Sequence, residues 1–280
     1  MLTVVGDLVA DIIVLGGDTL ARGTDNPAAV RLTRGGSAAN VAAAAAARHP
    51  VRFIGRVGDD SLGETLTREM TDAGVDVRVQ RAGRTGAIVV LVDGEGERTM
   101  ITDRGAAAEL EAIEPAWFDD SRWVHFPLYG FADSASRAVL MQAVHLLRGR
   151  GIPISLDLSS VATMADLGAD LLVELVSTIA PDVVFANSDE ATLASELGCA
   201  PPGVYVVKRG GDPVEVTWQG AMTAVPIERA PAVLDSTGAG DAFAAGYLAA
   251  ALAGADPVAA ARAGGDLALR ALRRPGALRS

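Results

Sequence analysis

The sequence has little of what disulfide-bonded, exported or membrane-spanning chains need. It contains one cysteine, Cys199, so no disulfide can form within the chain and a reducing compartment is indicated. The amino-terminal segment lacks a basic region, and Asp7 and Asp11 interrupt its apolar residues, which argues against a secretory signal. The longest stretch without a charged residue, 242–255, has fourteen residues, which is too short for about 30 Å of hydrocarbon. These absences predict a cytoplasmic protein that does not bind a membrane.

Positive charge is scarce as well. The chain has 24 Lys and Arg residues against 35 Asp and Glu residues, a net charge of −11. Because such a surface repels phosphate backbones, we expect no nucleic-acid partner. A small anionic ligand is still compatible, since a few backbone N–H groups at a helix start can bind it. No GxGxxG follows a predicted strand and no GxxxxGK[ST] occurs, so Rossmann and P-loop sites lack their usual anchors.

Short β-branched runs alternate with alanine- and leucine-rich helical stretches. Strands are predicted at residues 2–5, 51–54, 123–126, 152–156, 183–185 and 204–207. Helices are predicted at 37–48, 62–73, 134–147, 167–179, 189–197, 239–252 and 257–272. Strand–helix alternation implies right-handed crossovers, so we expect an α/β fold whose mostly parallel sheet carries helices on both faces. No Pro- or Ser-rich linker occurs, which predicts a single domain over residues 1–280.

Two segments, 9–33 and 86–102, break this alternation. The first predicts a strand, a glycine turn and a short strand, and the second predicts a hairpin. Because they have no helices to pair with, we expect a small separate sheet with hinges near Arg34 and Arg104.

The outer face of that small sheet is expected to need cover. It would expose strand edges and apolar residues such as Ile88, Val90 and Met100. This predicts a homodimer that forms through the small sheet.

The most informative segment is DSTGAGDAFAAGYLAAAL, residues 235–252. Gly238 and Gly240 precede a long apolar helix, so unobstructed N–H groups at its start would form an anion hole suited to a phosphoryl group. Asp241 would repel a phosphate, which makes sense if its carboxylate faces an incoming hydroxyl. The alternative is that Asp241 merely favours a helix N-terminus.

Two further segments carry polar groups at helix starts. In RGGSAANVAAAA, residues 34–45, Asn40 is either a tolerated polar residue or a ligand contact, since an unpaired buried amide costs about 1–3 kcal/mol. In NSDE, Asn187 and Glu190 form either a capping box or a pair of oxygen groups that orient water on Mg²⁺.

Taken in order, these segments resemble the ribokinase-like (PfkB) carbohydrate kinase family over nearly the whole chain. The matching motifs are VVGDLVAD at 4–11, GGSAAN at 35–40, FIGRVGDDSLGE at 53–64, NSDE at 187–190, VVKRGG at 206–211 and DSTGAGD at 235–241. The resemblance implies a three-layer αβα fold with a β-sheet lid, and an ATP-dependent enzyme that phosphorylates an alcohol group of a small sugar or sugar acid.

The resemblance also implies a role for particular residues. Asp241 would be the catalytic base, beside an anion hole formed by Gly238, Ala239 and Gly240. Asn187 and Glu190 would hold Mg²⁺ and phosphate through water. The acceptor hydroxyls would be held by Asp11, Gly36 and Asn40. The nucleotide would be lined by Lys208, Gly210, Gly211 and Gly265. A monovalent-cation site, for K⁺, would be shaped by Asp235 and Thr237.

The chain departs from the family pattern at three places that bear on substrate choice. Pro213 stands near where the family usually keeps another glycine, which leaves the nucleotide base open. The segment HFPLYG lacks an acidic residue, and Phe126 and Tyr129 could stack on a ring instead. Arg104 could bind an acceptor carboxylate or phosphate, or be a solvated hinge arginine, and we favour the second reading.

Two other functions compete with the sugar kinase. A nucleoside kinase of the same family would keep the mechanism and change the acceptor. A sugar- or nucleotide-binding sensor would keep the fold without catalysis, although a sensor has no need for Asp241, Gly238 and Gly240.

Overall fold

The protein is described by a computed structural model that covers residues 1–16, 20–93, 98–229 and 238–272. Its larger sheet has the strand order β13-β12-β11-β10-β9-β8-β1-β4-β5. The order from β11 to β5 is parallel throughout, whereas β12 and β13 are antiparallel additions at one edge. The strands are β1 (Leu2–Val5), β4 (Val51–Val57), β5 (Asp76–Arg81), β8 (Trp123–Pro127), β9 (Ile154–Asp157), β10 (Val183–Asn187), β11 (Val204–Lys208), β12 (Val214–Trp218) and β13 (Ala221–Val225).

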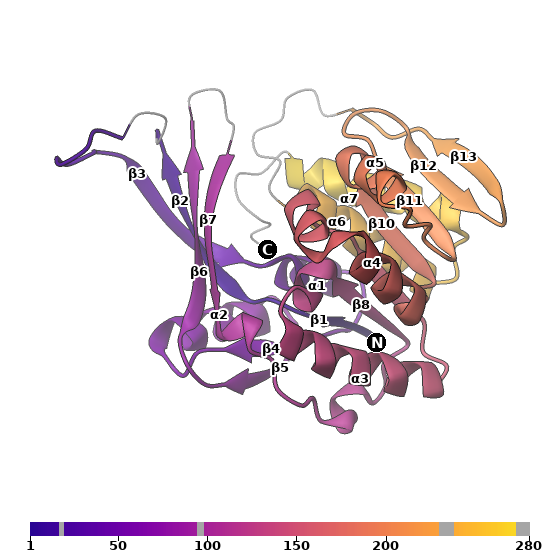
Figure 1. Cartoon of the computed structure of the whole chain (residues 1–280), viewed down its shortest axis with the longest axis horizontal. Coiled ribbons are helices and arrows are strands. Elements are labelled where there is room, and N and C mark those ends of the chain that lie inside the picture. The colour runs from indigo at the N-terminus through magenta and orange to yellow at the C-terminus, as the bar shows by residue number, and fades with distance from the viewer. Residues whose placement is uncertain (17–19, 94–97, 230–237, 273–280) are drawn as a thin grey trace.

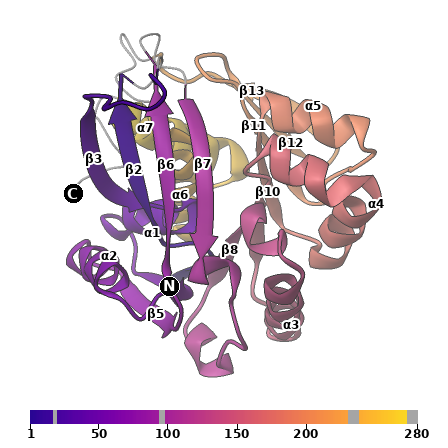
Figure 2. The same ribbon diagram turned by 60° about the vertical axis from the view of Figure 1, so that its left-hand side comes forward.

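Helices cover both faces of this sheet (Figures 1 and 2). One core lies between the sheet and the helices α1 (Ser37–Ala46), α2 (Ser61–Asp72), α6 (Ala239–Leu252) and α7 (Pro257–Leu272). The other lies on the opposite face, under α3 (Ser134–Gly149), α4 (Val161–Ile179) and α5 (Ser188–Glu196). The predicted three-layer α/β fold is therefore confirmed.

Helix starts follow the capping chemistry that the sequence indicates. Asp60, Asp133 and Ser160 each accept a hydrogen bond from a backbone N–H of the first turn that follows. One expectation was incomplete, because α4 begins at Val161 rather than at 167. Gly168 interrupts the helix with a φ of 73°, so the residues before it were not predicted to be helical.

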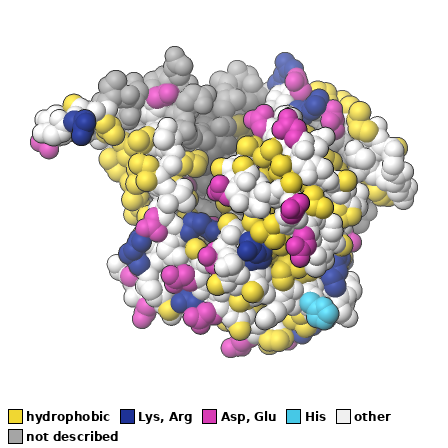
Figure 3. Space-filling view, viewed as in Figure 1, with side chains coloured by type: hydrophobic (Ala, Val, Ile, Leu, Met, Phe, Trp, Pro, Cys, Tyr) yellow, Lys and Arg dark blue, Asp and Glu magenta, His cyan; other side chains and the backbone are white. Residues whose placement is uncertain are grey.

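The two segments that break the alternation form a second sheet of four strands, in the order β3-β2-β6-β7. Its strands are β2 (Val9–Leu15), β3 (Ala29–Gly35), β6 (Thr85–Val92) and β7 (Arg98–Gly105). We call it the smaller sheet. It stands off the main body, at the left of Figure 1, and apolar side chains gather on it in Figure 3.

The two faces of the smaller sheet follow from its register. Ile13 pairs with Val90, and Val90 pairs with Met100, so these side chains share one face. That face lines a cavity, and Val90 is buried. The expectation that Ile88, Val90 and Met100 mark the outer face was therefore wrong, because they lie on the inner one.

Residues at the alternate positions of these strands point to the outer face, and many of them are apolar as well. This face carries Ile12 opposite Leu32 and Val89, and Val89 opposite Ile101. Ile101 is 60% exposed. Among the described residues, no helix is long and apolar enough to cross a membrane.

Candidate active site

A cavity of about 2170 Å³ lies between the inner face of the smaller sheet and the carboxyl edge of the larger one. Pockets for one small ligand usually hold about 300–1,000 Å³, so this cavity has room for two substrates. It brings together the described residues that the sequence predicted for the site: Asp11, Gly36, Asn40, Arg104, Asn187, Glu190, Lys208, Gly210, Gly211, Gly238, Ala239, Gly240, Asp241 and Gly265. Asp235 and Thr237 lie outside the described residues.

The start of α6 forms one wall of the cavity. Gly238 precedes the helix with a φ of 72°, a left-handed conformation that favours glycine. Gly240, in the first turn, leaves the backbone uncovered. Because the first N–H groups of a helix have no partner within it and lie at the positive end of its dipole, this wall can bind an anion.

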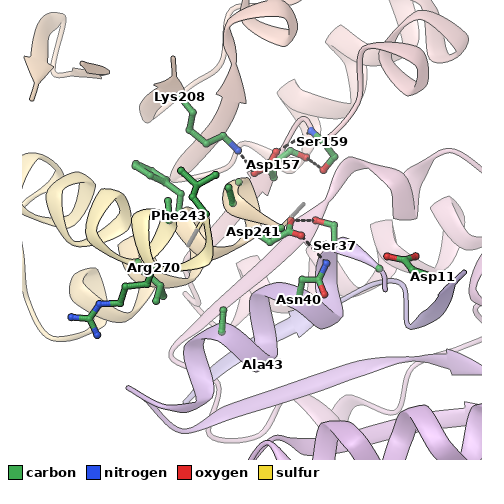
Figure 4. Close-up of a pocket in the computed structure, with 18 of the residues that line it drawn as sticks. Asp11, Ser37, Asn40, Ala43, Asp157, Ser159, Lys208, Asp241, Phe243 and Arg270 are labelled. Atoms are coloured by element: carbon green, nitrogen blue, oxygen red, sulfur yellow. Dashed lines mark hydrogen bonds and ion pairs between the residues drawn. The ribbon is translucent and has the colours of Figure 1, made fainter. Parts of the chain in front are cut away.

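Asp241 points toward helix α1 and is in direct contact with it (Figure 4). Its carboxylate accepts a hydrogen bond from Ser37 Oγ at 2.7 Å and another from Asn40 Nδ2 at 3.0 Å. These bonds link two helices, so favouring a helix N-terminus does not explain the residue by itself. Burial raises the pKa of Asp241 to about 6, although the bonds from Ser37 and Asn40 oppose the rise. A carboxylate with such a pKa can accept a proton near neutral pH.

The acceptor side of the cavity holds Asn40 and Asp11. Asn40 Oδ1 is buried and has no hydrogen-bond partner in the described part of the chain. An unsatisfied buried amide oxygen calls for a ligand donor, which favours the ligand-contact interpretation of Asn40. Burial, together with the charge of Asp241, raises the pKa of Asp11 to about 6.

Two glycines make room for these acceptor groups. A Cβ on Gly35 would lie 2.0 Å from Asp11 Oδ1, so a side chain there would displace the carboxylate. Gly36 has a φ of 96°, and its Cβ would lie 2.4 Å from the carbonyl oxygen of Asp7. The absence of side chains at Gly35 and Gly36 therefore lets the backbone at the end of β3 lie close against Asp11 and Asp7.

Arg104 is not the solvated hinge arginine that we favoured. Its Nε and Nη2 donate to the two carboxylate oxygens of Asp7 at 2.9 and 2.6 Å, and its side chain is 16% exposed. Asp7 lies in the loop from β1 to β2, and Arg104 lies in β7. A bidentate ion pair in the cavity wall therefore joins two of the segments that connect the larger sheet to the smaller one.

Asn187 and Glu190 form a complete capping box at the start of α5. Glu190 accepts from the backbone and side-chain nitrogens of Asn187 at 2.8 and 2.9 Å, and Asn187 Oδ1 accepts from the Glu190 backbone at 2.8 Å. Burial, followed by the charge of Asp157, raises the pKa of Glu190 to about 7. The described residues contain no group of three His, Cys, Asp or Glu side chains that could hold a metal directly.

Sequence reasoning missed the partners of several site residues. Asp157 ends β9 and pairs with Lys208, and Ser37 bonds to Asp241. Their positions at strand and helix ends near the carboxyl edge of a parallel sheet were the available signal.

The two aromatic residues proposed to stack on a ring differ. Tyr129 lines the cavity, and its hydroxyl donates to the Ser159 carbonyl. Phe126 has no exposed surface and packs edge-on against Phe131 in the core, so it was wrongly included.

The nucleotide end of the predicted site follows β11. Gly210 has a φ of 59° and open space around its Cβ position. At Gly265 a Cβ would lie 2.6 Å from Ile227 Cγ2, so close packing of α7 is also a sufficient reason for that glycine.

Comparisons with known proteins agree with this geometry. The model of the pfkB family carbohydrate kinases matches residues 1–280. An ATP-dependent ribose-1-phosphate kinase of Halopiger xanaduensis is 34% identical over 241 residues, which are 80% of this chain and 76% of that protein. A fructokinase of Klebsiella pneumoniae is 29% identical over 286 residues, which are 95% and 89% of the two chains.

Solved structures show the same fold. An adenosine kinase of Sinorhizobium meliloti has a TM-score of 0.87 at 24% identity, over 99% of this chain and 94% of that one. An Arabidopsis thaliana ribokinase complexed with ribose and ATP has a TM-score of 0.81 at 24% identity, over 98% and 93%. These likenesses confirm the predicted ribokinase-like fold. The family match over the whole chain confirms the predicted kinase activity: the chain belongs to the pfkB family of carbohydrate kinases.

Proposed function

We propose that this protein transfers the γ-phosphate of ATP to an alcohol group of a small sugar or sugar acid, with Asp241 as general base. The observation that carries the proposal is the placement of Asp241. Its carboxylate lies at the anion-binding start of α6 and is held by Ser37 and Asn40 on the acceptor side. A hydroxyl held there would meet both a proton acceptor and the phosphoryl position.

The reaction needs alignment and charge stabilisation more than covalent chemistry. As the acceptor oxygen bonds to the γ-phosphorus, its proton passes to the Asp241 carboxylate, and the bond to the ADP oxygen breaks. The N–H groups at Ala239 and Gly240 would bind the phosphoryl oxygens. An oxyanion-hole donor typically contributes about 10²–10³ in rate.

Asn40 and Asp11 would hold the acceptor. The unpartnered Oδ1 of Asn40 fits a hydroxyl donor, and Asp11 accepts from hydroxyls when it is ionised. Gly36 lets the backbone approach the acceptor closely. Acceptor contact was the alternative role considered for Arg104, but its ion pair with Asp7 favours a bracing role in the hinge.

ATP and Mg²⁺ fit the remaining residues. Lys208, Gly210, Gly211 and Gly265 line the nucleotide end of a cavity that has room for both substrates. Asn187 and Glu190 would accept hydrogen bonds from waters of a bound Mg²⁺, an ion that usually keeps several waters. When bound, Mg²⁺ would neutralise part of the phosphate charge. A K⁺ site at Asp235 and Thr237 stays a prediction.

The smaller sheet would cover the acceptor and exclude water, which protects ATP from hydrolysis. Its apolar inner face, with Ile13, Val90 and Met100, favours a second candidate acceptor, a nucleoside whose base would lie against this face. The proteins compared above bear the names of a fructokinase, a ribose-1-phosphate kinase, a ribokinase and an adenosine kinase, and these names do not choose between the candidates.

We also propose a cytoplasmic homodimer. The outer face of the smaller sheet carries exposed apolar side chains, among them Val30 and Ile101, which are 63% and 60% exposed. Such a face can pack against the same face of a second copy of the chain. The single cysteine suits a reducing compartment. The acidic chain gives no reason to expect nucleic acid or a membrane as partner.

The test is an acceptor panel of sugars, sugar acids, sugar phosphates and nucleosides, assayed for ADP release with Mg²⁺-ATP, with and without K⁺. Turnover on sugars or sugar acids supports the leading proposal, and turnover on nucleosides alone replaces it with the second. Tight binding of acceptor and ATP with no ADP release would leave the non-catalytic sensor.

A further inference from the structure

Lys208 is the one lysine in the whole sequence, and it lies in the cavity wall rather than on the surface. Its Nζ donates to Asp157 Oδ2 at 2.8 Å, and the two side chains are 16% and 6% exposed. Lysine is almost never buried without a partner, and a buried ion pair seldom stabilises a fold more than apolar residues would. Stability alone therefore does not explain this pair.

Asp157 holds Lys208 in one direction. Its Oδ1 accepts from the Ser159 backbone N–H at 2.9 Å, which leaves Oδ2 facing the ammonium group. This bond uses one of the three N–H donors of Lys208, and two others remain.

Lys208 Nζ lies beside the first turn of α6. A Cβ built on Gly240 would be 3.4 Å from Nζ, so the ammonium group and the helix start border the same space. Figure 4 shows Lys208 and Asp157 on one side of Asp241, with Asn40 and Asp11 on the other. An anion at the helix start would therefore contact Lys208 directly.

The local charge keeps Lys208 protonated. Burial lowers its pKa, but Asp157 and Glu190 outweigh that effect, with a smaller contribution from Asp241, so the pKa is raised. Two cavity-lining arginines that follow β11 are engaged elsewhere, since Arg209 pairs with Glu215 and Arg229 with Asp212.

We propose that Lys208 is a catalytic residue that contacts the transferring phosphoryl group, and that Asp157 is the residue that positions it. This assignment rests on the proposed kinase function, and it replaces the simpler role of lining the nucleotide. A fixed ammonium group stabilises charge that develops on the phosphoryl oxygens without reorganising during the reaction. Lysine suits this task as a compact point charge.

The first experiment uses the single lysine as a probe. Protein labelled with ¹³C-lysine gives one lysine side-chain signal, which is followed by NMR during titration with Mg²⁺-ADP and with Mg²⁺-AMP-PNP. Contact with the γ-phosphoryl group predicts a large shift with AMP-PNP and a small one with ADP. Equal shifts with both, or none with either, would overturn the proposal. This readout needs no turnover, so it stands even if no acceptor is phosphorylated.

The second experiment separates rate from affinity. Lys208→Met removes the ammonium group, and Lys208→Gln removes the charge but keeps an N–H donor for Asp157. Either change should lower kcat about 10²–10³-fold. The Kd for ADP should stay within threefold, and the preference for AMP-PNP over ADP should be lost. Arg150→Met, at a surface ion pair with Asp119, is the control for removal of a positive charge. A kcat within threefold of the wild type, in a variant with native melting, would refute the catalytic role.

The positioning role of Asp157 is tested by a pH profile. Asp157→Asn removes the charge that raises the pKa of Lys208, so the alkaline fall in kcat should move to lower pH. Asp157→Glu should restore part of the wild-type profile. An Asp157→Asn profile with an unmoved alkaline limb would show that Asp157 is only structural.

Discussion

Replacing Asp241 with asparagine separates the general base from a structural role. In Asp241→Asn the amide oxygen can still accept from Asn40 Nδ2, and the amide nitrogen can donate to Ser37 Oγ, so both observed contacts are kept. What disappears is the negative charge and the capacity to take a proton. Turnover should then fall about 10²–10⁴-fold, the usual contribution of a positioned base.

The same change should stabilise the fold at neutral pH. Burial raises the pKa of Asp241 from 3.8 to about 6, so folding favours its protonated form. The resulting cost of ionisation is absent below about pH 3.8 and complete above about pH 6. Two pKa units correspond to about 3 kcal/mol, which we reduce to about 1–2 kcal/mol because the carboxylate lines the open cavity rather than the closed core. Asp241→Asn should therefore melt several degrees higher at pH 7.5.

The assay is kcat on the best acceptor, measured beside thermal melting at pH 7.5 and pH 5. The stabilisation should shrink at pH 5, where wild-type Asp241 is largely protonated. Asp133→Asn is the matched control, because Asp133 caps α3 away from the cavity, and asparagine caps equally well. Turnover within threefold of the wild type would refute the base assignment. A lower melting temperature with lost activity would refute the reasoning from burial.

Three other outcomes are expected. The kcat/KM of the wild type should be about tenfold lower at pH 5 than on its plateau, since a base with a pKa of about 6 is mostly protonated there, and a flat profile would contradict this. Gly35→Ala should raise the acceptor KM about tenfold or more by displacing Asp11, with nucleotide affinity unchanged, and an additive loss in the double variant with Asp11→Ala would argue against it. Ile101→Lys should convert a dimer to a monomer in light scattering, and a wild type that is monomeric at micromolar concentration would reject the dimer.

Local patterns were sufficient for the body of the fold. Residues 239–252 and 257–272 were predicted as helices and are helical over the same bounds in α6 and α7. Three strands of the larger sheet were missed: β5 and β13 at its two edges, and β12 next to β13. β13 has almost no buried residue, so it lacks the alternation that marks a strand, and β5 is only half buried.

The parts of the candidate site that depend on glycine-rich backbone and on local motifs could be predicted from the sequence. The contacts between side chains that are distant in sequence could not. Ser37 and Asp241 are far apart in sequence, as are Asp7 and Arg104, and they meet because of the strand order. The side of the smaller sheet that faces the cavity was misjudged for a similar reason. Alternation shows which residues share a face, but it does not show which face turns inward.

The bond between Ser37 and Asp241 spans 204 residues of chain. Ser37 and Asn40, which bond to the Asp241 carboxylate, are synthesised early, on α1, whereas the carboxylate belongs to α6. During synthesis, the residues proposed to hold the acceptor therefore leave the ribosome long before Asp241, the residue proposed to accept the proton. Because closing long loops delays contacts of high sequence separation, catalytic competence should be among the last properties that this enzyme acquires as it folds.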